Sequence, residues 1–437
     1  MTFDRGRLMD ERRIALLVLA SLTVTAGCSM PFGTEDAIGR EGGYSATDEL
    51  DVTTDDGLNE SERASVVHRT MARIEVIRGL EFDRDVSVRV ISRAAYREQR
   101  KQFGLSSTNA TEWTEQVWEA LFLVDEPTNA TEAVSDVYRG SVLGYYSEGD
   151  IVIVSDSNTP RIDPYTLAHE LTHALQDQQL TLNVRTETRD AQLAANGLVE
   201  GDANAVEYEY RHRCGGSWSC LPQPGQSADN ADRNQGVYTT ISMPYIQGPA
   251  FIRALSERGG WETVNDAYES FPESTEQIIH PARYPDERPE SVRITDRSTG
   301  NWQRFAGSPQ EETVGEVSIY TMFRTNGVIP APQNGRENYS HPLSAGWAGD
   351  RLVPYNNTDG QNGYVWKTKW DTERDAKQFV DGYERLLERH NASAVDGTHR
   401  LPESNPYADA FRVTRDGSTV TIVNAPTTDE LDRIHRP

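Results

Sequence analysis

The chain has 437 residues, of which 68 are Asp or Glu and 43 are Lys or Arg, so its formal net charge is −25. This length allows two domains with a large core, and so acidic a chain without a basic cluster argues against nucleic acid as a partner. Only four basic residues are lysine: Lys101, Lys367, Lys369 and Lys377. Such a surface suits a protein that is soluble in very high salt, because salt screens its self-repulsion.

The N-terminal segment resembles a lipoprotein signal peptide. Two arginines precede an apolar run from Ile14 to Val24, and the segment ends in Thr25-Ala26-Gly27-Cys28. A lipobox places the modified cysteine after a small residue, so the resemblance implies that residues 1–28 form the signal and that Cys28 carries a lipid. The apolar run is short for a membrane-spanning helix. We therefore expect a lipid anchor that holds the protein at the outer face of the cytoplasmic membrane.

Residues 29–59 are rich in Gly, Ser, Thr, Asp and Glu, and we expect them to form a flexible tether. From Glu60 to Leu80 the apolar residues follow a helical period, and Val86 to Ile91 alternates as a strand does. Two further helices are expected over residues 93–103 and 111–123.

The segments Val142–Tyr146 and Ile151–Val154 predict a β-hairpin, with its turn at Glu148-Gly149-Asp150. A helix follows ten residues later. The free edge of such a hairpin could pair with an extended peptide through main-chain hydrogen bonds. The alternative is a plain internal hairpin.

The segment Tyr165–Gln176 contains the motif His169-Glu170-Leu-Thr-His173. Asp163 and Pro164 are suited to the N-cap and the first helical position. A helix buried on one side is predicted by the spacing of Leu167, Leu171 and Leu175. His169 and His173 then leave the same face one turn apart, where both can bind one Zn²⁺. Glu170 lies beside them and could take a proton from a zinc-bound water. The alternative is a surface helix with two satisfied histidines.

A catalytic zinc needs three protein ligands and one open position, so a third ligand must come from elsewhere. The next predicted helix, Asp190 to Tyr210, offers Glu200, with Asp202 and Glu207 as competitors. Asp202 lies about 200° further round the helix and should point away, and Glu207 lies two turns, about 10 Å, further along. We expect Glu200 to be the ligand. Small residues leave room for the motif helix to approach: Gly197, Gly201 and Ala203. The alternative is a solvated acidic face.

Apart from Cys28, the cysteines are Cys214 and Cys220. In an exported protein, an even number of remaining cysteines suggests a disulfide. The two glycines between these two cysteines would let so short a loop close. Glycosylation would fit an exported chain, and six Asn-x-Ser/Thr sites occur, at Asn59, Asn109, Asn129, Asn338, Asn356 and Asn391.

Two helices are expected near residues 244–258 and 260–270. His280, which precedes a proline, could then reach the floor of a cleft and act in catalysis, and its neighbours Arg283 and Tyr284 could donate to a developing oxyanion. The alternative is a structural histidine that caps a helix end. Residues 301–437 differ in composition from the preceding part of the chain. They predict a smaller α+β unit, in which we recognise no catalytic or binding motif.

The motif His169-Glu170-Leu-Thr-His173 with the downstream Glu200-Gly-Asp-Ala resembles the zincin metallopeptidases that use glutamate as third ligand, as thermolysin-like enzymes do. The resemblance implies that His169, His173 and Glu200 bind zinc and that Glu170 is the general base. The thermolysin-like pattern has Asp four residues after the ligand Glu, where this chain has Asn204. A neutral amide orients a ligand histidine less strongly than a carboxylate does. Most of the chain is similar to secreted surface lipoproteins of haloarchaea.

We therefore expect an α+β fold with a zincin-like catalytic domain over residues 60–300, a hairpin before the motif helix, and the unit at 301–437. The expected function is that of a lipid-anchored, zinc-dependent peptidase on the cell surface, which acts on a peptide or protein substrate. The alternative is a non-catalytic envelope or adhesion protein with a structural or relict zinc site. The sequence does not specify an oligomeric state.

Overall fold

The computed structural model describes residues 37–436 except for several short internal stretches, namely residues 54–55, 104–107, 140–143, 148, 183, 225–232, 307–308 and 334. The side chains of residues 100–103, 108–111 and 138–139 are also outside the description. The predicted signal peptide with Cys28, and Val142 and Glu148 of the predicted hairpin, lie outside the described residues. The described residues belong to one compact unit, Glu35–Pro437, and it mixes helices with strands, which confirms the α+β class.

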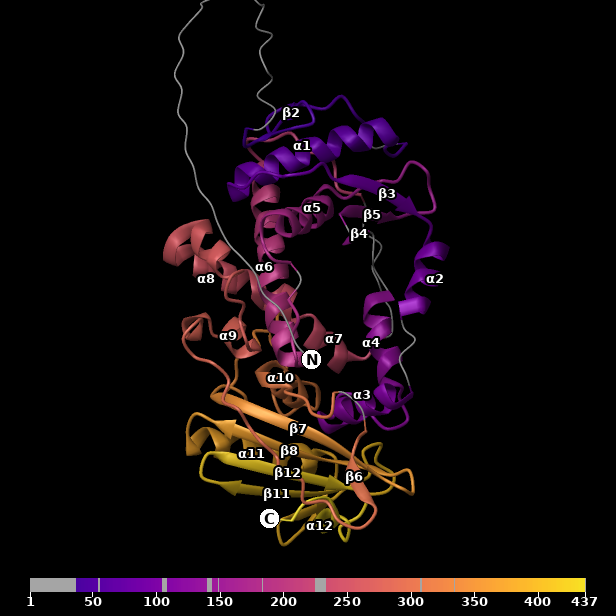
Figure 1. The fold of residues 1–437 in the computed structure, drawn as a ribbon, viewed down its shortest axis with the longest axis vertical. Coiled ribbons are helices and arrows are strands. Elements are labelled where there is room, and N and C mark those ends of the chain that lie inside the picture. Colours follow the sequence, from indigo (N-terminus) through magenta and orange to yellow (C-terminus); the bar gives the residue numbers. More distant parts are fainter. Residues whose placement is uncertain are drawn as a thin grey trace, which may run out of the picture. The chain divides into compact units, whose positions relative to one another are not determined.

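The first described elements are two short strands that lie beside a long helix (Figure 1). They are β1 (Arg40–Glu41), β2 (Tyr44–Ser45) and α1 (Glu60–Arg78). The predicted helix at residues 60–80 is thereby confirmed. Its first turn is closed by Asn59, whose side chain accepts hydrogen bonds from the backbone N–H groups of Ser61 and Glu62.

Buried side chains of α1 bind the backbone that precedes the helix. Arg73 Nε donates to the carbonyl of Ala46 at 2.8 Å, and Gly39 N donates to Glu75 Oε2 at 2.8 Å. Leu58 is also fully buried. The prediction of a flexible tether as far as residue 59 is therefore wrong for the described residues from 37 onwards, because polar groups of α1 need this backbone as hydrogen-bond partner.

A small sheet precedes the motif helix, with strands in the order β3-β5-β4. β3 (Ser87–Ile91) runs parallel to β5 (Asp150–Val154), and β4 (Gly144–Ser147) pairs antiparallel with β5. The expected strand and hairpin are thus confirmed. Among the described strands β4 lies at an edge of this sheet, and it contacts the motif helix. Three helices lie between β3 and β4 in the sequence, namely α2 (Arg93–Phe103), α3 (Thr108–Ala120) and α4 (Ala130–Arg139).

The motif helix α5 (Pro164–Gln179) and the next helix α6 (Arg189–Cys214) pack against each other. Asp163 caps α5 by accepting from the N–H groups of Tyr165 and Thr166, and Pro164 is its first residue, as expected. The predicted apolar stripe is confirmed, since Leu167, Leu171 and Leu175 are all buried.

The glycines of α6 allow close approach of other helices than the one expected. A Cβ on Gly201 would lie 2.5 Å from the backbone of Gly248 in α8 (Met243–Asp266), and a Cβ on Gly197 would meet Ile278 of α9 (Thr275–Ile279). The room that these small residues leave is therefore filled by α8 and α9, and not by the motif helix. The two helices expected at 244–270 form α8, which is kinked at Gly259 and Gly260. They follow α7 (Gln235–Ile241).

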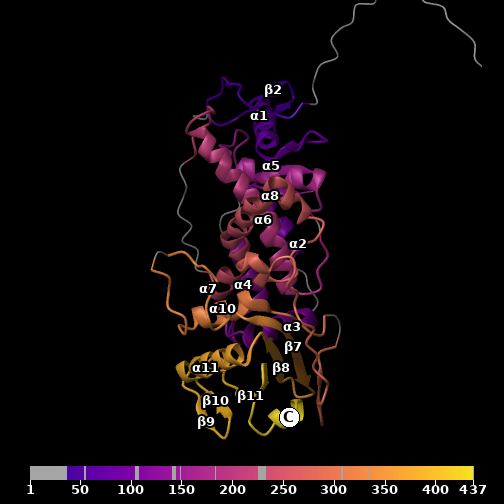
Figure 2. The ribbon, with the colours of Figure 1, turned by 90° about the vertical axis from the view of Figure 1, so that its left-hand side faces the viewer.

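The C-terminal part contains a larger sheet, with strands in the order β6-β7-β8-β12-β11-β10-β9. Figure 2 shows α11 beside this sheet, and α11 contacts β8, β11 and β12. A single hydrophobic core runs from α3 through α6, α8 and α10 to this sheet, so the predicted boundary at residue 300 falls inside one core. The remaining elements are η1 (Pro281–Arg283), β6 (Trp302–Arg304), α10 (Gly315–Thr325), β7 (Trp347–Asn357), β8 (Asn362–Trp370), α11 (Glu373–Arg389), β9 (Ser393–Val395), β10 (Thr398–Arg400), β11 (Ala410–Asp416), β12 (Thr419–Ala425) and α12 (Leu431–Ile434).

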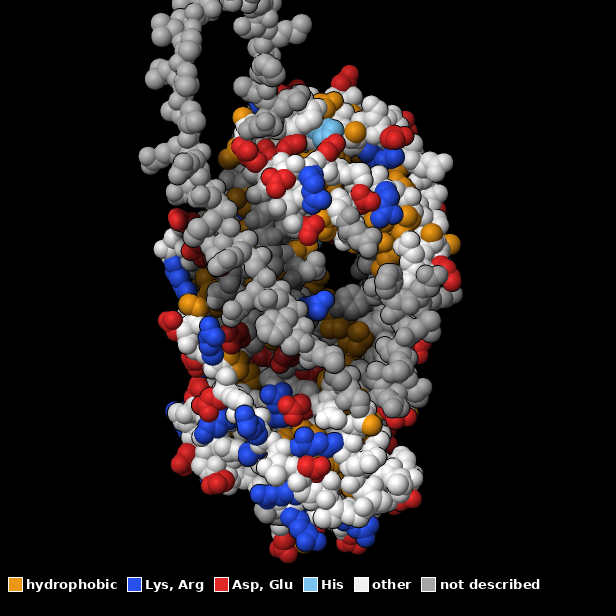
Figure 3. All heavy atoms as spheres, in the orientation of Figure 1, with side chains coloured by type: hydrophobic (Ala, Val, Ile, Leu, Met, Phe, Trp, Pro, Cys, Tyr) orange, Lys and Arg blue, Asp and Glu red, His pale blue; other side chains and the backbone are white. Residues whose placement is uncertain are grey.

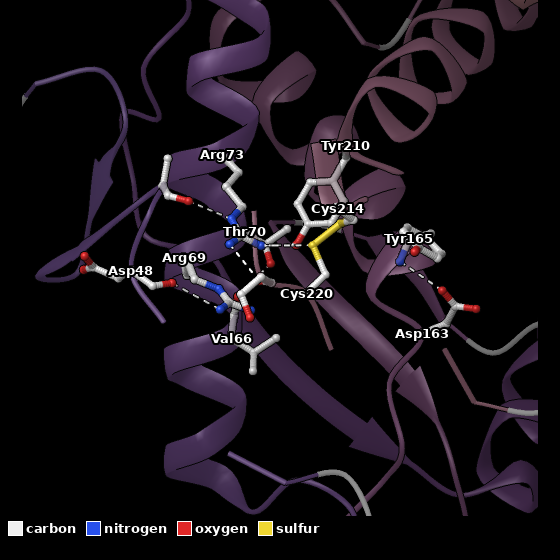
Figure 4. Close-up of a disulfide and its surroundings, with 12 residues drawn as sticks. Asp48, Val66, Arg69, Thr70, Arg73, Asp163, Tyr165, Tyr210, Cys214 and Cys220 are labelled. Carbon is white, nitrogen blue, oxygen red and sulfur yellow. Dashed lines mark hydrogen bonds between the residues drawn. A yellow bond between two sulfur atoms is a disulfide. The ribbon is translucent and has the colours of Figure 1, made fainter. Parts of the chain in front are cut away.

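The predicted disulfide is confirmed: Cys214 and Cys220 are bonded at the end of α6 (Figure 4). Beside it lies the fully buried Arg73. This guanidinium donates to Tyr210 Oη at 3.2 Å and to the carbonyl of Ser219 at 2.9 Å. Because the acceptors come from α6 and from the disulfide loop, this arginine ties both to α1.

None of the helices in the described part of the chain combines the length and apolar character that a membrane span needs. On the face drawn in Figure 3, acidic and basic side chains are mixed over the described part of the C-terminal sheet region.

Candidate metal centre

Helix α5 presents His169 and His173 on one face, one turn apart. Their Nε2 atoms lie 3.2 Å from each other. From α6, Glu200 Oε2 lies 3.2 Å from His169 Nε2 and 3.4 Å from His173 Nε2. The structure therefore brings together the three predicted ligands, and it does so through the packing of α5 on α6.

These three separations can be compared with what zinc requires. Zinc bonds of about 2.0–2.1 Å in tetrahedral geometry place any two ligand atoms about 3.3 Å apart. The observed separations of 3.2, 3.2 and 3.4 Å match this value on all three sides of the triangle. The residues present thus fit a zinc ion without movement of either helix.

The hydrogen bonds around His173 fix which of its nitrogens faces the centre. Gln176 Nε2 donates to the carbonyl of Val199 at 3.0 Å and to Asp202 Oδ2 at 3.1 Å, so Gln176 Oε1 is the end that faces His173 Nδ1, at 2.8 Å. A carbonyl oxygen can only accept, and His173 Nδ1 must therefore carry a proton. In the neutral ring, Nε2 then has a free lone pair directed at the centre.

His169 has a corresponding partner. Its Nδ1 lies 3.7 Å from Glu207 Oε2, a distance suited to an electrostatic contact with an N–H at Nδ1. Glu207 is in turn held by Arg211 Nη2 at 2.7 Å. Both ligand histidines are thus oriented from behind by acceptors, as is usual for histidines that bind metal.

Glu200 is held at both of its oxygens. Oε2 faces the two histidines, and Oε1 accepts a hydrogen bond from Tyr245 Oη of α8 at 3.0 Å. This arrangement leaves Glu200 Oε2 as the oxygen available to a metal ion. Tyr245 was not foreseen in the sequence, because nothing local marks a tyrosine 45 residues away on another helix.

The titration of the site reflects the convergence of these groups. Burial alone lowers the pKa of His169, but the carboxylates of Glu200 and Glu207 outweigh it and raise this pKa to about 10. His173 is also raised against its burial, chiefly by Glu200. Burial would raise the pKa of Glu200, yet the two imidazoles hold it far below its ordinary value. Without metal, protons on the histidines therefore balance the Glu200 charge.

This balance predicts that zinc and protons compete. Zinc binding must displace at least one imidazole proton at neutral pH, because the pKa of His169 lies near 10 and that of His173 is also raised. The apparent affinity for zinc should thus fall about tenfold per pH unit, per proton displaced, as the pH decreases from about 9 to 6. Competition with a chelator of known affinity measures this slope, and calorimetry in two buffers counts the protons. An affinity that is constant over this range would contradict the assignment.

Glu170 lies next to the triangle but does not belong to it. Burial raises the pKa of its carboxyl above the ordinary value, while the nearby histidines lower it. Glu170 Oε2 accepts a hydrogen bond from the backbone N–H of Tyr146 in β4 at 2.9 Å. The site thus places a carboxylate of raised basicity between the histidines and the edge strand.

A cavity of about 540 Å³ opens over these groups. Helix α2 and strand β4 contribute lining residues, and so do the three candidate ligands His169, His173 and Glu200. The described lining residues include Tyr96, Gln99, Gly144, Tyr145, Tyr146, His169, Glu170, His173, Leu182, Asn196, Val199, Glu200 and Tyr245. The cavity is large enough for several residues of an extended peptide or for a small ligand.

The expectation that His280 acts in catalysis is not met. Its Nε2 pairs with the buried Glu316 Oε1 of α10 at 3.1 Å, and His280 is not among the described residues that line the cavity. Arg283 binds Glu276 and Asp371, and Tyr284 Oη donates to the carbonyl of Ser270. All three residues connect α9 and η1 to their neighbours, and none of them is among the described residues that line the cavity.

The competitors for the third ligand position have other roles. Asp202 points away, as predicted, and pairs with Arg78 of α1, although it supports His173 through Gln176. Glu207 is not among the three ligand groups, as predicted, but its carboxylate reaches the rear of the His169 ring, a contact that the sequence did not indicate. Asn204 does not contact a ligand histidine: its side chain donates to the Glu200 carbonyl at 2.8 Å. Gln176 was overlooked, although its spacing of three from His173 could have indicated it.

Residues 303–435 match a family model described as a domain of unknown function (DUF8575), and the metal centre lies outside this range. No curated protein matches the chain. Among solved structures, the chain is similar to a crystal structure described as a "putative hydrolase with a novel fold" from Chloroflexus aurantiacus. The identity is 18%, over 51% of this chain and 88% of that chain, with a TM-score of 0.30. This likeness is too slight to carry an argument about fold or activity.

Proposed function

We propose that the chain is a zinc-dependent peptidase of zincin type, with His169, His173 and Glu200 as ligands and Glu170 as general base. One observation carries the proposal. Three electron-rich atoms, two imidazole nitrogens and a carboxylate oxygen, converge at the mutual distances that zinc imposes, with the half-buried carboxylate of Glu170 beside them. The resemblance of the motif to zincins agrees with this arrangement.

The number of ligands favours an enzyme over a protein with a structural zinc. Structural zinc sites are closed by four protein ligands, whereas catalytic sites have three and leave one position for water or substrate. Within the described residues, the cluster around the motif offers three ligand groups, His169, His173 and Glu200. The open cavity in front of them supports the same conclusion.

Bound zinc would polarise the scissile carbonyl and lower the pKa of its water to about 7. Glu170 would accept the proton of that water and later deliver it to the leaving amine. Its carboxylate is held in place by the Tyr146 N–H. Tyr245 Oη lines the same cavity and donates to Glu200 Oε1 at 3.0 Å, so it would hold this carboxylate in place while Oε2 binds the metal.

The substrate would lie along β4. The Tyr146 N–H points away from β5, since it bonds Glu170, and alternation along the strand gives Gly144 the same direction. Both residues line the cavity. An extended peptide could therefore add to this edge with its backbone close to Glu170, which is the role expected for the hairpin. A lipid on Cys28 would hold the enzyme at the outer face of the membrane.

The proposal is tested by zinc content and peptide cleavage, assayed in high salt. The wild-type chain should bind one zinc at this centre and cleave a peptide library, lose activity to a chelator and regain it with zinc. Loss of an orienting partner usually costs 10–100-fold in metal affinity. Glu207→Ala should therefore weaken zinc binding by about that factor, and Glu200→Ala by more.

Glu209→Ala is the matched control, because Glu209 lies on the same helix and pairs with Arg213 away from the histidines. It should bind zinc and cleave peptides as the wild type does. A wild-type chain that binds zinc tightly but cleaves no peptide would contradict the peptidase assignment, and equal zinc affinity in Glu200→Ala would contradict the ligand set.

A further inference from the structure

A second cluster of possible metal ligands is formed by other parts of the chain than those that carry His169, His173 and Glu200. Glu119 at the end of α3, Glu126 in the following loop and Asp409 just before β11 bring carboxylate oxygens within 4.8 Å of one another. They line a cavity of about 420 Å³. Asp409 is only 7% exposed, whereas Glu126 is exposed.

An independent observation points to a ligand in this cavity. Gln116, one turn before Glu119, lines the same cavity and is 2% exposed. Its amide nitrogen donates to Glu119 Oε2 at 3.2 Å, so the position of the amide is fixed. Its carbonyl oxygen, Oε1, is buried and has no hydrogen-bond partner. A buried carbonyl oxygen without a donor costs about 1–3 kcal/mol, unless a cation or other donor meets it.

The carboxylates in the cavity also lack a close cationic partner. No Lys or Arg is among the described residues that line the cavity, and the attraction of Arg400 for Asp409 is outweighed by burial. Burial and mutual repulsion raise the pKa of Glu119 well above its usual value, and burial raises the pKa of Asp409 to about 7. Like charges drawn together in this way need either protons or a cation.

We infer that Glu119, Glu126, Asp409 and the Gln116 carbonyl form a binding site for Ca²⁺. The four groups offer oxygen atoms only, which is what a hard divalent cation prefers, whereas zinc prefers nitrogen and sulfur. Ca²⁺–oxygen bonds of 2.3–2.6 Å allow two ligands on opposite sides to be up to about 5 Å apart, so the carboxylates can share one ion. Ca²⁺ also accepts irregular geometry, whereas Mg²⁺ demands a near-ideal octahedron.

The ion would join parts of the chain that are far apart in sequence. Glu119 and Glu126 belong to the α3 region, and Asp409 belongs to the C-terminal region matched by the family of unknown function. The two segments are already in contact, because the Glu126 N–H donates to the Pro406 carbonyl at 3.3 Å. Bound Ca²⁺ would therefore stabilise the attachment of the C-terminal sheet and leave the zinc centre unchanged.

The test uses the zinc-loaded full chain at constant KCl, with Ca²⁺ titrated by calorimetry and thermal unfolding followed in parallel. Wild type should bind one Ca²⁺ at this cluster and unfold at a higher temperature with it. Glu126→Gln and Asp409→Asn should each raise the Kd for Ca²⁺ at least about tenfold, as expected when one of a few charged ligands is lost. Glu403→Gln, an exposed acid in the same region, is the control and should behave as wild type.

A second measurement, on Glu126→Gln, tests the inference even if Asp409→Asn does not fold. In a chelator selective for Ca²⁺, Glu126→Gln should unfold at a higher temperature than wild type, because it removes a repelling charge. With Ca²⁺ present, the order should reverse. The inference is overturned if wild type binds no Ca²⁺ up to about 10 mM, well above the 10⁻⁴–10⁻³ M of weak extracellular sites. It is equally overturned if Glu126→Gln binds Ca²⁺ as tightly as wild type.

Discussion

Replacing Glu170 by glutamine is expected to reduce peptide hydrolysis about 10²–10⁴-fold while zinc remains bound. Glutamine has the same size, and its carbonyl can still accept the hydrogen bond from the Tyr146 N–H that holds Glu170 now. It cannot take a proton from water or return one to a leaving amine. The three ligand atoms come from other side chains, so the metal affinity should change little.

The measurement is kcat/KM for the same peptide in wild type and variant, with zinc content determined on the same samples. Asp177→Asn on the same helix is a suitable control, since Asp177 faces Tyr146 Oη and Arg84 and belongs to neither the triangle nor the cavity lining. If Glu170→Gln cleaves peptides as fast as wild type while the control does too, Glu170 is not the general base. If the variant loses its zinc, the loss of activity would have no bearing on proton transfer and Glu170 would be a metal ligand instead.

The local signals of the sequence were sufficient for α5. Its cap, its first proline, its apolar stripe and the spacing of His169 and His173 are all set within about 16 consecutive residues, and short-range rules govern each of them. The choice of Glu200 over Asp202 also needed only the geometry of a single helix. Reasoning of this kind correctly assigned each side chain to one face of its helix.

Contacts between elements were not predictable in this way. Tyr245 reaches Glu200 because Gly201 and Gly248 let α6 and α8 approach closely, and that crossing depends on tertiary packing. The contact of Glu207 with His169 was missed because only the distance from Glu200 along α6 was considered. Glu207 reaches the rear of the His169 ring, which lies on another helix. The polar composition of residues 37–59 suggested a tether, but buried polar groups on α1 bind this backbone.

The second large effect is expected at the pair Arg78–Asp202, which ties α1 to α6 behind the metal centre. Arg78 Nε lies 3.1 Å from Asp202 Oδ1, and the side chains are 1% and 0% exposed. Tyr268 Oη and Gln176 Nε2 donate to the same carboxylate. Removing one partner of such a pair leaves a buried charge without compensation, and this typically costs about 3–5 kcal/mol. Asp202→Asn should therefore lower the free energy of unfolding by about that amount.

The exposed pair Lys377–Asp381 is the matched comparison. Its charged atoms are closer, at 2.6 Å, but the side chains are 65% and 49% exposed. Exposed pairs contribute about 0–1 kcal/mol, so Asp381→Asn should be almost neutral although the contact is shorter. Denaturant unfolding in a chelator measures both variants without any contribution from zinc. Equal stability of Asp202→Asn and wild type would show that the pair does not hold α1 to α6. Because Asp202 also fixes Gln176 behind His173, the same variant with metal present should bind zinc about 10-fold more weakly, whereas Asp381→Asn should bind it as wild type does.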